Sequence, residues 1–283
     1  MAAHGLPVPT TAEGKAGLAA LVAHPRRSLI AVDFDGTLAP IVADPAQARA
    51  TPAATAALTR LAGLAGTVAI ITGRPAADAA SFAGVAAVPG VIVLGHYGRQ
   101  RWERGRLSGP EPPAGLVTAR TELPAVLAGA GAGAGVFVED KGDALAVHTR
   151  RATTPQAELD RLREPLSALA ARTGLAVQPG RLVLELRPPG ADKGGAIREL
   201  AAERRPSAIL FCGDDLGDSP AFAAVRELRG RDIPGLLVCS GSAEVPDLGA
   251  AADLVVDGPA GVAGLLAGLA GAFAAADHGG FAD

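Results

Sequence analysis

Apolar residues gather in short runs along the chain, and segments with helical spacing lie between them. Six runs have no polar alternation, as is typical of strands buried in a sheet; they cover residues 28–32, 67–71, 91–94, 208–212, 236–239 and 254–256. The segments that indicate helices are 11–23, 51–64, 75–83, 192–202 and the stretch from 261 onward. This alternation predicts an open α/β sheet of about six strands.

A different pattern separates the third run from the fourth. Residues 99–107 contain a glycine-centred turn and predict a small hairpin, and the prolines at 110–113 mark a boundary. From residue 135 to 188 the chain reads as a self-contained α+β unit. Its expected elements are a hairpin over 136–148, a helix over 155–173 and a strand over 182–186. A unit inserted between core strands resembles a lid over a site.

Two acids follow the first strand directly. Asp33 and Asp35 stand one residue apart, and Gly36 supplies the turn that comes after them. Open α/β sheets place ligands at the carboxyl ends of their strands. Two close carboxylates repel each other unless a cation or a shared proton relieves them. The spacing suits a cation, with one acid attacking phosphorus and the other reaching the leaving oxygen; the alternative is an Asx turn after a strand.

Polar residues also follow the second and fourth strands. Thr72-Gly73-Arg74-Pro75 joins a hydroxyl to free backbone N–H groups ahead of a helix, which suits a phosphoryl oxygen but also an ordinary turn. Lys193 can bring a positive charge to the same phosphoryl group. The alternative is an ordinary solvated lysine. Asp214, Asp215 and Asp218 follow the fourth strand, so several carboxylates again lie close enough to repel one another, as at Asp33 and Asp35. A Mg²⁺ ion bridging the two acidic clusters would relieve this repulsion.

Composition narrows the choice of partners and compartment. The net charge of −3 provides no basic surface for nucleic acid. Cys212 and Cys239 each end an apolar run and are expected to be buried core residues. The amino terminus has no basic stretch followed by an apolar run, and no segment approaches 18 unbroken apolar residues. We therefore expect a soluble cytoplasmic protein with no membrane segment.

Taken in order, these motifs resemble a known family. The four matching motifs are Asp33-Phe34-Asp35-Gly36-Thr37, Thr72-Gly73-Arg74, Lys193 and Gly213-Asp214-Asp215-x-x-Asp218. They are similar to the four motifs of haloacid dehalogenase-like phosphatases. Three further stretches resemble the trehalose-6-phosphate phosphatase family in particular: Val138-Glu-Asp-Lys, Ala144-Leu-Ala-Val-His and Glu185-Leu-Arg-Pro. The likeness runs from about residue 26 to residue 275.

The resemblance implies a domain arrangement. It predicts a doubly wound, mostly parallel Rossmann-like core with an inserted α/β cap domain. The implied limits are an N-terminal extension (1–25), a hydrolase core (26–107 and 188–275), a cap (108–187) and a tail (276–283).

The resemblance also implies roles for individual residues. Asp33 would be the nucleophile and Asp35 the acid that protonates the leaving sugar oxygen, while Thr72 and Lys193 would hold the phosphoryl oxygens. Mg²⁺ would be bound by Asp33, the Asp35 carbonyl and Asp214, with Asp215 and Asp218 holding its waters or orienting Lys193. Substrate contacts are expected from Arg74, Glu139, Lys141, Arg150 and Glu185. The charged loop around Glu139 can also be a solvated turn.

The chain departs from the family pattern after Asp215. Gly217 stands where the family has a hydroxyl and Ser219 where it has a carboxylate, which leaves the first metal ligands in place.

The implied activity is Mg²⁺-dependent hydrolysis of the small-molecule sugar phosphate trehalose 6-phosphate, with a trehalose-6-phosphate synthase as a partner in the same pathway. A variant of this hypothesis takes sucrose 6-phosphate or a glycosylglycerate phosphate. The alternative is a catalytically silent module that binds sugar phosphate. The presence of Asp33, Asp35, Lys193 and Asp214 favours the enzyme.

Overall fold

The computed structural model describes residues 5–42, 44–180, 182–241 and 246–279 and divides the chain into two compact units. Unit 1 comprises Met1–Gly109 with Asp192–Asp283, and unit 2 comprises Pro110–Ala191. These boundaries differ from the limits at 107/108 and 187/188 expected from the sequence. The first falls later because the second strand of the small hairpin, β5, ends at Ser108 and belongs to the sheet of unit 1.

Unit 1 is built on an eight-stranded sheet with the order β12-β11-β10-β1-β2-β3-β4-β5. Its parallel strands are β1 (Ser28–Val32), β2 (Thr67–Ile71), β3 (Val91–Gly95), β10 (Ala208–Gly213), β11 (Gly235–Gly241) and β12 (Leu254–Asp257). The hairpin of β4 (Gln100–Glu103) and β5 (Arg106–Ser108) pairs antiparallel at one edge. All six runs read as buried strands are strands of this sheet, so the expected α/β class is confirmed.

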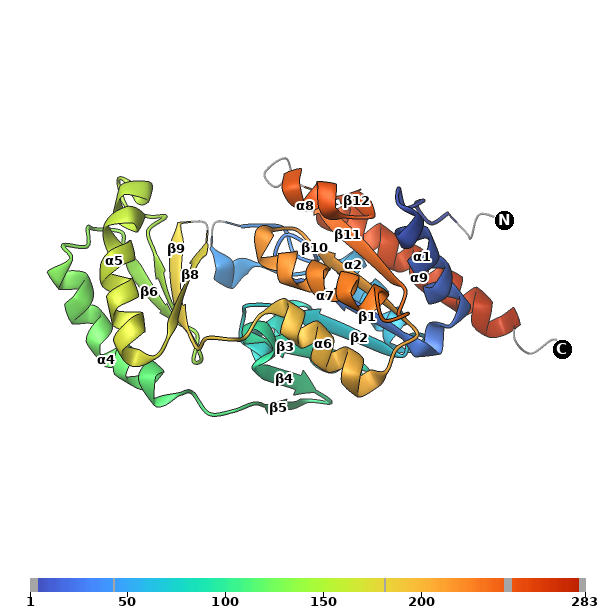
Figure 1. Cartoon of the computed structure of the whole chain (residues 1–283), viewed down its shortest axis with the longest axis horizontal. Helices are drawn as coiled ribbons and strands as arrows, with labels where there is room; N and C mark the ends of the chain where they lie inside the picture. Colours follow the sequence, from blue (N-terminus) through green and yellow to red (C-terminus); the bar gives the residue numbers. More distant parts are fainter. Residues whose placement is uncertain (1–4, 43, 181, 242–245, 280–283) are drawn as a thin grey trace. The chain divides into compact units, whose positions relative to one another are not determined.

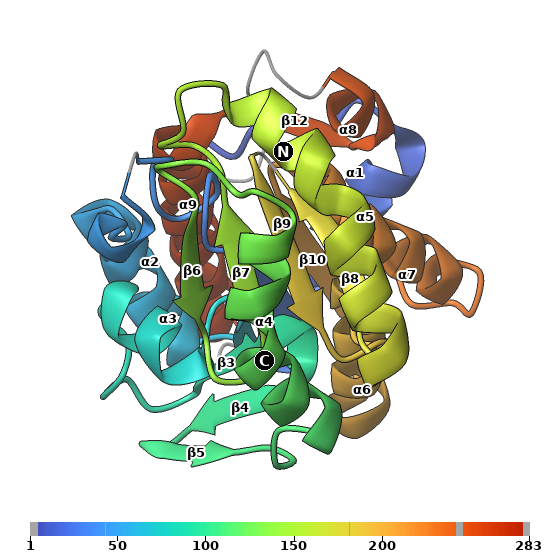
Figure 2. The same ribbon diagram turned by 90° about the vertical axis from the view of Figure 1, so that its left-hand side faces the viewer.

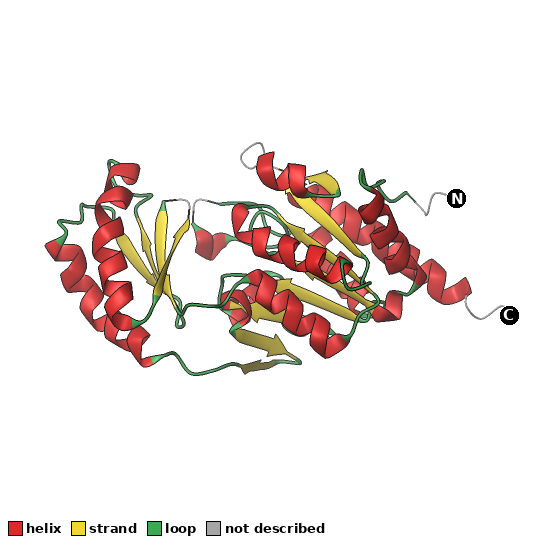
Figure 3. Cartoon of the chain, viewed as in Figure 1, coloured by secondary structure: helices red, strands yellow, loops and turns green. Residues whose placement is uncertain are grey.

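Helices cover both faces of this sheet (Figure 1). Buried residues of α1 (Ala12–Ala23), α2 (Pro52–Ala62), α3 (Ala76–Phe82) and α9 (Gly258–Gly279) form one apolar cluster with the sheet. Those of α6 (Lys193–Arg204), α7 (Ser219–Arg229) and α8 (Pro246–Ala251) form a second cluster on the other face. Figure 3 shows the resulting alternation of strands and helices. The core is therefore doubly wound.

The amino-terminal helix, which lies within the expected extension over residues 1–25, belongs to unit 1. Thr11 caps α1 by accepting the N–H of Gly14, and its hydroxyl donates to the buried Asp253. Gly17 lies so close to Gly235 that a Cβ would stand 2.0 Å from the Gly235 carbonyl oxygen. At the other end, residues 276–279 of the expected tail continue α9, and residues 280–283 lie outside the described residues.

Helix α9 is the one helix of the described chain that is long and apolar enough to cross a membrane. Several of its side chains, among them Leu266, Leu269 and Phe273, are fully buried. They belong to the apolar cluster that packs on the sheet. Packing on the sheet is enough to explain these apolar side chains, because the buried face of a core helix is as apolar as a membrane span.

Unit 2 contains a four-stranded antiparallel sheet and two helices (Figure 2). The strand order is β6 (Phe137–Asp140), β7 (Leu145–His148), β9 (Val183–Arg187) and β8 (Ala176–Gly180). Helices α4 (Ala114–Gly129) and α5 (Pro155–Thr173) pack on one face through buried leucines. The sequence did not indicate β8, because Pro179 and Gly180 interrupt its pattern. Both residues are tolerated there because β8 lies at the edge of the sheet.

Candidate active site

The sheet register brings the first and fourth strand ends together. Val32 of β1 lies opposite Cys212 of β10, so Asp33 and Asp214 follow at the same edge. The N–H of Asp33 donates to the Cys212 carbonyl at 2.8 Å. Gly36 has φ +75°, and a Cβ there would lie 1.9 Å from Asp214 Oδ2. Only glycine therefore allows the loop after β1 to pass beside this acid.

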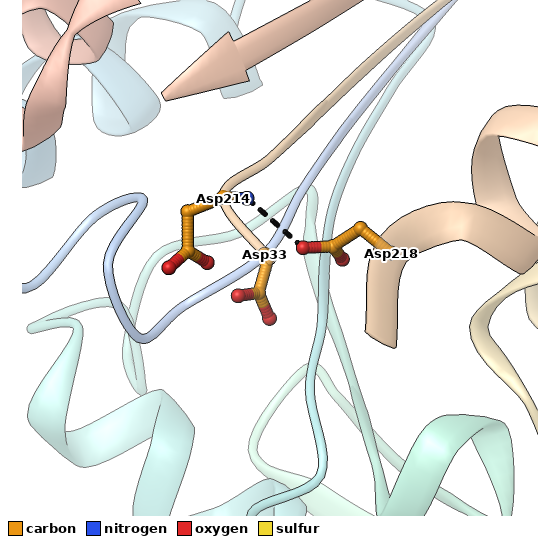
Figure 4. Close-up of side chains that lie close together, drawn as sticks. All are labelled: Asp33, Asp214 and Asp218. Atoms are coloured by element: carbon orange, nitrogen blue, oxygen red, sulfur yellow. Dashed lines mark hydrogen bonds between the residues drawn. The ribbon is translucent and has the colours of Figure 1, made fainter. Parts of the chain in front are cut away.

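Three carboxylates converge at this edge. Oxygen atoms of Asp33, Asp214 and Asp218 all lie within 4.8 Å of one another, as Figure 4 illustrates. The Asp33 and Asp218 side chains are buried, while Asp214 is half-buried. Asp218 Oδ2 accepts the backbone N–H of Asp214 at 3.0 Å, which holds two of the acids in place. The acids predicted from two separate strands thus form one cluster.

Lys193 lies between two of these acids. Its Nζ is 2.7 Å from Asp33 Oδ1 and 2.6 Å from Asp218 Oδ1, and the lysine is only 5 % exposed. It begins α6, which Asp192 caps by accepting the N–H of Gly195. Burial alone would lower the pKa of Lys193, but the neighbouring carboxylates outweigh it and hold this pKa well above its usual value. The ammonium group therefore keeps its charge.

One lysine does not neutralise the cluster. Burial raises the pKa of Asp214 to about 7, and Asp218 and Asp215 add to the rise. Burial also raises the pKa of Asp33, although Lys193 opposes this. A raised carboxyl pKa shows that the positive charge nearby is too small to offset burial and the neighbouring acids. Three converging carboxylate oxygens fit a small divalent cation such as Mg²⁺, which prefers such ligands.

Asp35 lies outside the three-acid cluster and pairs with Arg74. The guanidinium Nε and Nη2 atoms each lie 2.7 Å from a different Asp35 oxygen, in a bidentate arrangement. Arg74 also donates to the Pro45 carbonyl at 2.9 Å and lies over the rings of Phe34 and Phe82. The substrate role of Arg74 stays a prediction. In this structure its guanidinium holds Asp35.

Thr72 follows β2, which pairs with β1, and so lies at the same edge of the sheet. Its hydroxyl accepts the N–H of Arg74 at 3.2 Å.

Two residues at this edge received no role from the sequence. Thr37 Oγ1 lies 3.5 Å from Asp214 Oδ1, and Ser240 Oγ donates to the Gly36 carbonyl at 2.7 Å. Ser240 lies near the end of the parallel strand β11, a signal that was available in the sequence.

The loop after β10 is ordered by its own acids. Asp215 Oδ1 accepts the N–H of Gly217 at 2.8 Å, and Asp215 and Asp218 form a capping box. Asp215 thus orders the loop and is not one of the three clustered acids. Gly217 and Ser219, the two departures from the family pattern, leave Asp218 fully buried against Lys193.

The candidate sugar-binding residues of unit 2 belong to one ion pair and to one chain of three residues. Lys141 Nζ lies 2.6 Å from Glu185 Oε2. Glu139 Oε2 lies 2.9 Å from Nε2 of His148, whose Nδ1 lies 3.3 Å from an Arg150 nitrogen. Glu185 is 6 % exposed, and its Oε1 atom is buried without a hydrogen-bond partner in the described structure. A buried carboxylate oxygen without a donor is costly, so this atom suits a ligand hydroxyl.

Comparisons with known proteins agree on one family. The model of the trehalose-phosphatase family matches residues 31–103 and 120–250. A Mycobacterium avium relative named trehalose-phosphate phosphatase is 35 % identical over 249 residues, which cover 83 % of this chain and 60 % of the relative. The chain thus spans 60 % of that relative's length.

Solved structures agree on the fold. The C-terminal domain of Candida albicans trehalose-6-phosphate phosphatase matches with TM-score 0.74 and 23 % identity, covering 94 % of this chain and 99 % of that one. A haloacid dehalogenase-like hydrolase from Bacteroides thetaiotaomicron matches with TM-score 0.57 and 17 % identity over 84 % of this chain and 98 % of that one. These likenesses support a Rossmann-like core with an inserted cap.

Proposed function

Because the chain belongs to the trehalose-phosphatase family, within the haloacid dehalogenase-like fold, we propose that it hydrolyses trehalose 6-phosphate to trehalose and phosphate with Mg²⁺. The observation that carries this proposal is the buried Asp33 held beside Lys193 in a cluster of three carboxylates. A cytoplasmic location and a synthase partner in the same pathway are parts of the same proposal.

The proposed reaction has two displacements. A carboxylate oxygen of Asp33 attacks phosphorus, the bond from phosphorus to the sugar oxygen breaks, and Asp35 gives its proton to that oxygen. Water then attacks the aspartyl-phosphate while Asp35 takes a proton from it, which releases phosphate and restores both acids. A covalent intermediate splits one difficult step into two. Phosphate monoesters need such help, because enzymes must accelerate their very slow hydrolysis by up to ~10²¹-fold.

The charged neighbours have separate tasks in this reaction. Lys193 keeps a positive charge beside Asp33, where negative charge builds on the phosphoryl oxygens. Arg74 positions the Asp35 carboxyl group through two hydrogen bonds of 2.7 Å. Thr72 supplies a hydroxyl at the same sheet edge. Asp33, Asp214 and the Asp35 carbonyl would hold Mg²⁺, with Asp215 and Asp218 holding its waters or orienting Lys193. The ion would supply positive charge to the phosphoryl group and offset the crowded carboxylates.

Metal binding should depend on pH because Asp214 must lose its proton. The pKa of Asp214 is raised from 3.8 to about 7, so its proton stabilises the metal-free fold at low pH and this contribution is lost as the pH rises through 7. Mg²⁺ competes with that proton. We expect the increase in Tm caused by Mg²⁺ to grow between about pH 5 and pH 8, as measured by thermal unfolding with Mg²⁺ or with EDTA.

Asp214→Asn is the matched control for this prediction. It should flatten the pH dependence, because the amide neither holds the proton nor attracts the ion. An equal Mg²⁺-dependent shift at every pH in the unaltered protein would contradict a role for Asp214 in metal binding.

Unit 2 supports recognition of a hydroxyl-rich substrate. Glu185 presents a buried carboxylate oxygen without a donor, and its other oxygen is held by Lys141. Sugar hydroxyls donate and accept hydrogen bonds, so a Lys–Glu pair offers both partners at one place. A site built to bond hydroxyls also rejects analogues that lack them.

Glu185→Gln should therefore lower activity toward trehalose 6-phosphate selectively. The amide keeps the shape but weakens the contact with Lys141 and replaces one acceptor by a donor. We expect kcat/KM for trehalose 6-phosphate to fall about ten- to hundredfold, from the loss of a charge-assisted hydrogen bond. Hydrolysis of a small aryl phosphate should change less than twofold, because that substrate has no sugar hydroxyls.

The control for this variant is Glu164→Gln, the same change at an exposed position of α5. Both substrates should be hydrolysed by it as by the unaltered protein. Equal losses of the two substrates in Glu185→Gln would remove this residue from sugar recognition.

Phosphate release from a panel of sugar phosphates with Mg²⁺ tests the proposed function itself. We expect trehalose 6-phosphate to have the highest kcat/KM. Preference for sucrose 6-phosphate or a glycosylglycerate phosphate would keep the chemistry and change the substrate. No release from any member, together with sugar-phosphate binding by calorimetry, would favour the silent binding module.

A further inference from the structure

His148 is a buried residue of unit 2 to which the sequence motifs assigned no separate role. Its side chain is 4 % exposed and lies at the end of β7. Both ring nitrogens have a charged neighbour: Nε2 lies 2.9 Å from Glu139 Oε2, and Nδ1 lies 3.3 Å from Arg150 Nη2. These two neighbours are residues for which we propose a part in sugar recognition.

A ring stack fixes the plane of the imidazole. Phe137 lies directly opposite His148 in the antiparallel pair of β6 and β7. The two rings are 4.7 Å apart between centroids and 13° from parallel. The Arg151 guanidinium also lies over the Phe137 ring, at 4.5 Å. The stack therefore fixes the plane of the imidazole. The contacts of Nε2 with Glu139 and of Nδ1 with Arg150 fix which way the ring faces within that plane.

The partners allow only one protonation state. A guanidinium carries donors only, so Nδ1 must accept from Arg150. An ionised carboxylate carries acceptors only, so Nε2 must donate to Glu139. The other neutral tautomer would oppose two acceptors at Nε2 and two donors at Nδ1. The doubly protonated ring would still oppose donors at Nδ1. His148 therefore fits as the neutral ring with its proton on Nε2.

Glu139 and Glu185 lie on the polar face of the sheet in unit 2. Glu139 lies opposite Ala146, and Ala146 lies opposite Glu185, so the two glutamates share one row and one face. The buried leucines of β7 and β9 belong to the apolar cluster with α4 and α5 on the other face. Glu139 is 41 % exposed and needs an anchor to keep one rotamer. Among its contacts, the hydrogen bond from the buried His148 provides such an anchor.

We propose that His148 is a positioning residue for sugar recognition: as the neutral Nε2–H tautomer, it links Glu139 to Arg150 and holds both side chains in one arrangement. The inference rests on the proposed function, because it assigns these two side chains to the sugar hydroxyls. It adds a residue that acts through others, without itself touching the reacting atoms.

The tautomer can be tested without any substrate. Nitrogen NMR of the imidazole in the full chain at neutral pH should report a protonated Nε2 and an unprotonated Nδ1 for His148. The signal is assigned by its loss in His148→Phe. A ring protonated at Nδ1, or on both nitrogens, would overturn the proposal whatever the enzyme hydrolyses.

Kinetics then test the positioning role. His148→Phe keeps an aromatic ring against Phe137 and removes both hydrogen bonds. We expect KM for trehalose 6-phosphate to rise about tenfold or more, as for the loss of a charge-assisted hydrogen bond. Values of kcat for a small aryl phosphate should change less than twofold. Val138→Ala, a neighbouring change on the opposite face of β6, is the control and should alter neither substrate.

A double-variant comparison separates positioning from a structural role. If His148 acts through Glu139, then Glu139→Ala should raise KM similarly, and the double variant should be little worse than either single variant. Additive losses, or equal losses with both substrates, would overturn the inference. If the unaltered protein hydrolyses the aryl phosphate but not trehalose 6-phosphate, the proposed substrate fails, while the NMR result still decides the arrangement of His148.

Discussion

Asp33→Asn should reduce phosphate release from trehalose 6-phosphate by ~10⁴-fold or more, in keeping with the loss of other catalytic nucleophiles. The amide has nearly the same shape as the carboxylate, but its oxygen is a poor nucleophile. Its oxygen can still accept from Lys193, which lies 2.7 Å from Asp33 Oδ1. Removing one charge from a crowded cluster also relieves repulsion. We therefore expect the variant to fold and its Tm to stay the same or rise.

Two measurements complete this test. Phosphate release is compared with Asp160→Asn, the same change at an exposed position of α5, which should have no effect. Mass spectrometry of the unaltered protein, quenched during turnover, should find one phosphoryl group attached, and the variant should carry none. Normal turnover by Asp33→Asn would refute the assignment of the nucleophile.

Replacing Lys193 by methionine should have the second largest effect, because it should lower both the stability of the fold and the rate of turnover. Methionine fills the same space but leaves Asp33 and Asp218 without the ammonium group that lies within 2.7 Å of both. Breaking a buried ion pair by removing one partner costs about 3–5 kcal/mol. Losing a charge aimed at the reacting group typically costs about 10²–10³ in kcat. Denaturant unfolding and phosphate release measure the two losses.

Added Mg²⁺ separates the two effects of this variant. The proposed cation would bind the same acids, so it should restore much of the stability while leaving kcat low. Lys15→Met, at an exposed position of α1, is the matched control and should change neither property. A Lys193→Met protein with unaltered turnover would show that this charge serves the fold alone.

The strand ends that form the candidate site were visible in the sequence because each depends on local features. An apolar run followed by acids needs only a few neighbouring residues to be recognised, as at residues 28–35 and 208–215. Parallel strands all expose their carboxyl ends at one edge, so both groups of acids were expected at that edge. Asp33 and Asp214 meet there because β1 and β10 are neighbouring strands. The buried cysteines followed from the same runs. Strand β8 was missed where proline and glycine break the local pattern.

By itself, then, the sequence determined the α/β class, the six parallel strands and the acids that gather at one sheet edge, because periodicity and turn residues act over short distances. Only the tertiary structure decided which charged groups pair: Arg74 with Asp35, Lys193 with both Asp33 and Asp218, and His148 with Glu139. Such pairs join residues from separate elements or opposing strands. Their choice depends on side-chain rotamers, burial and competing charges, which exist only once the chain has folded.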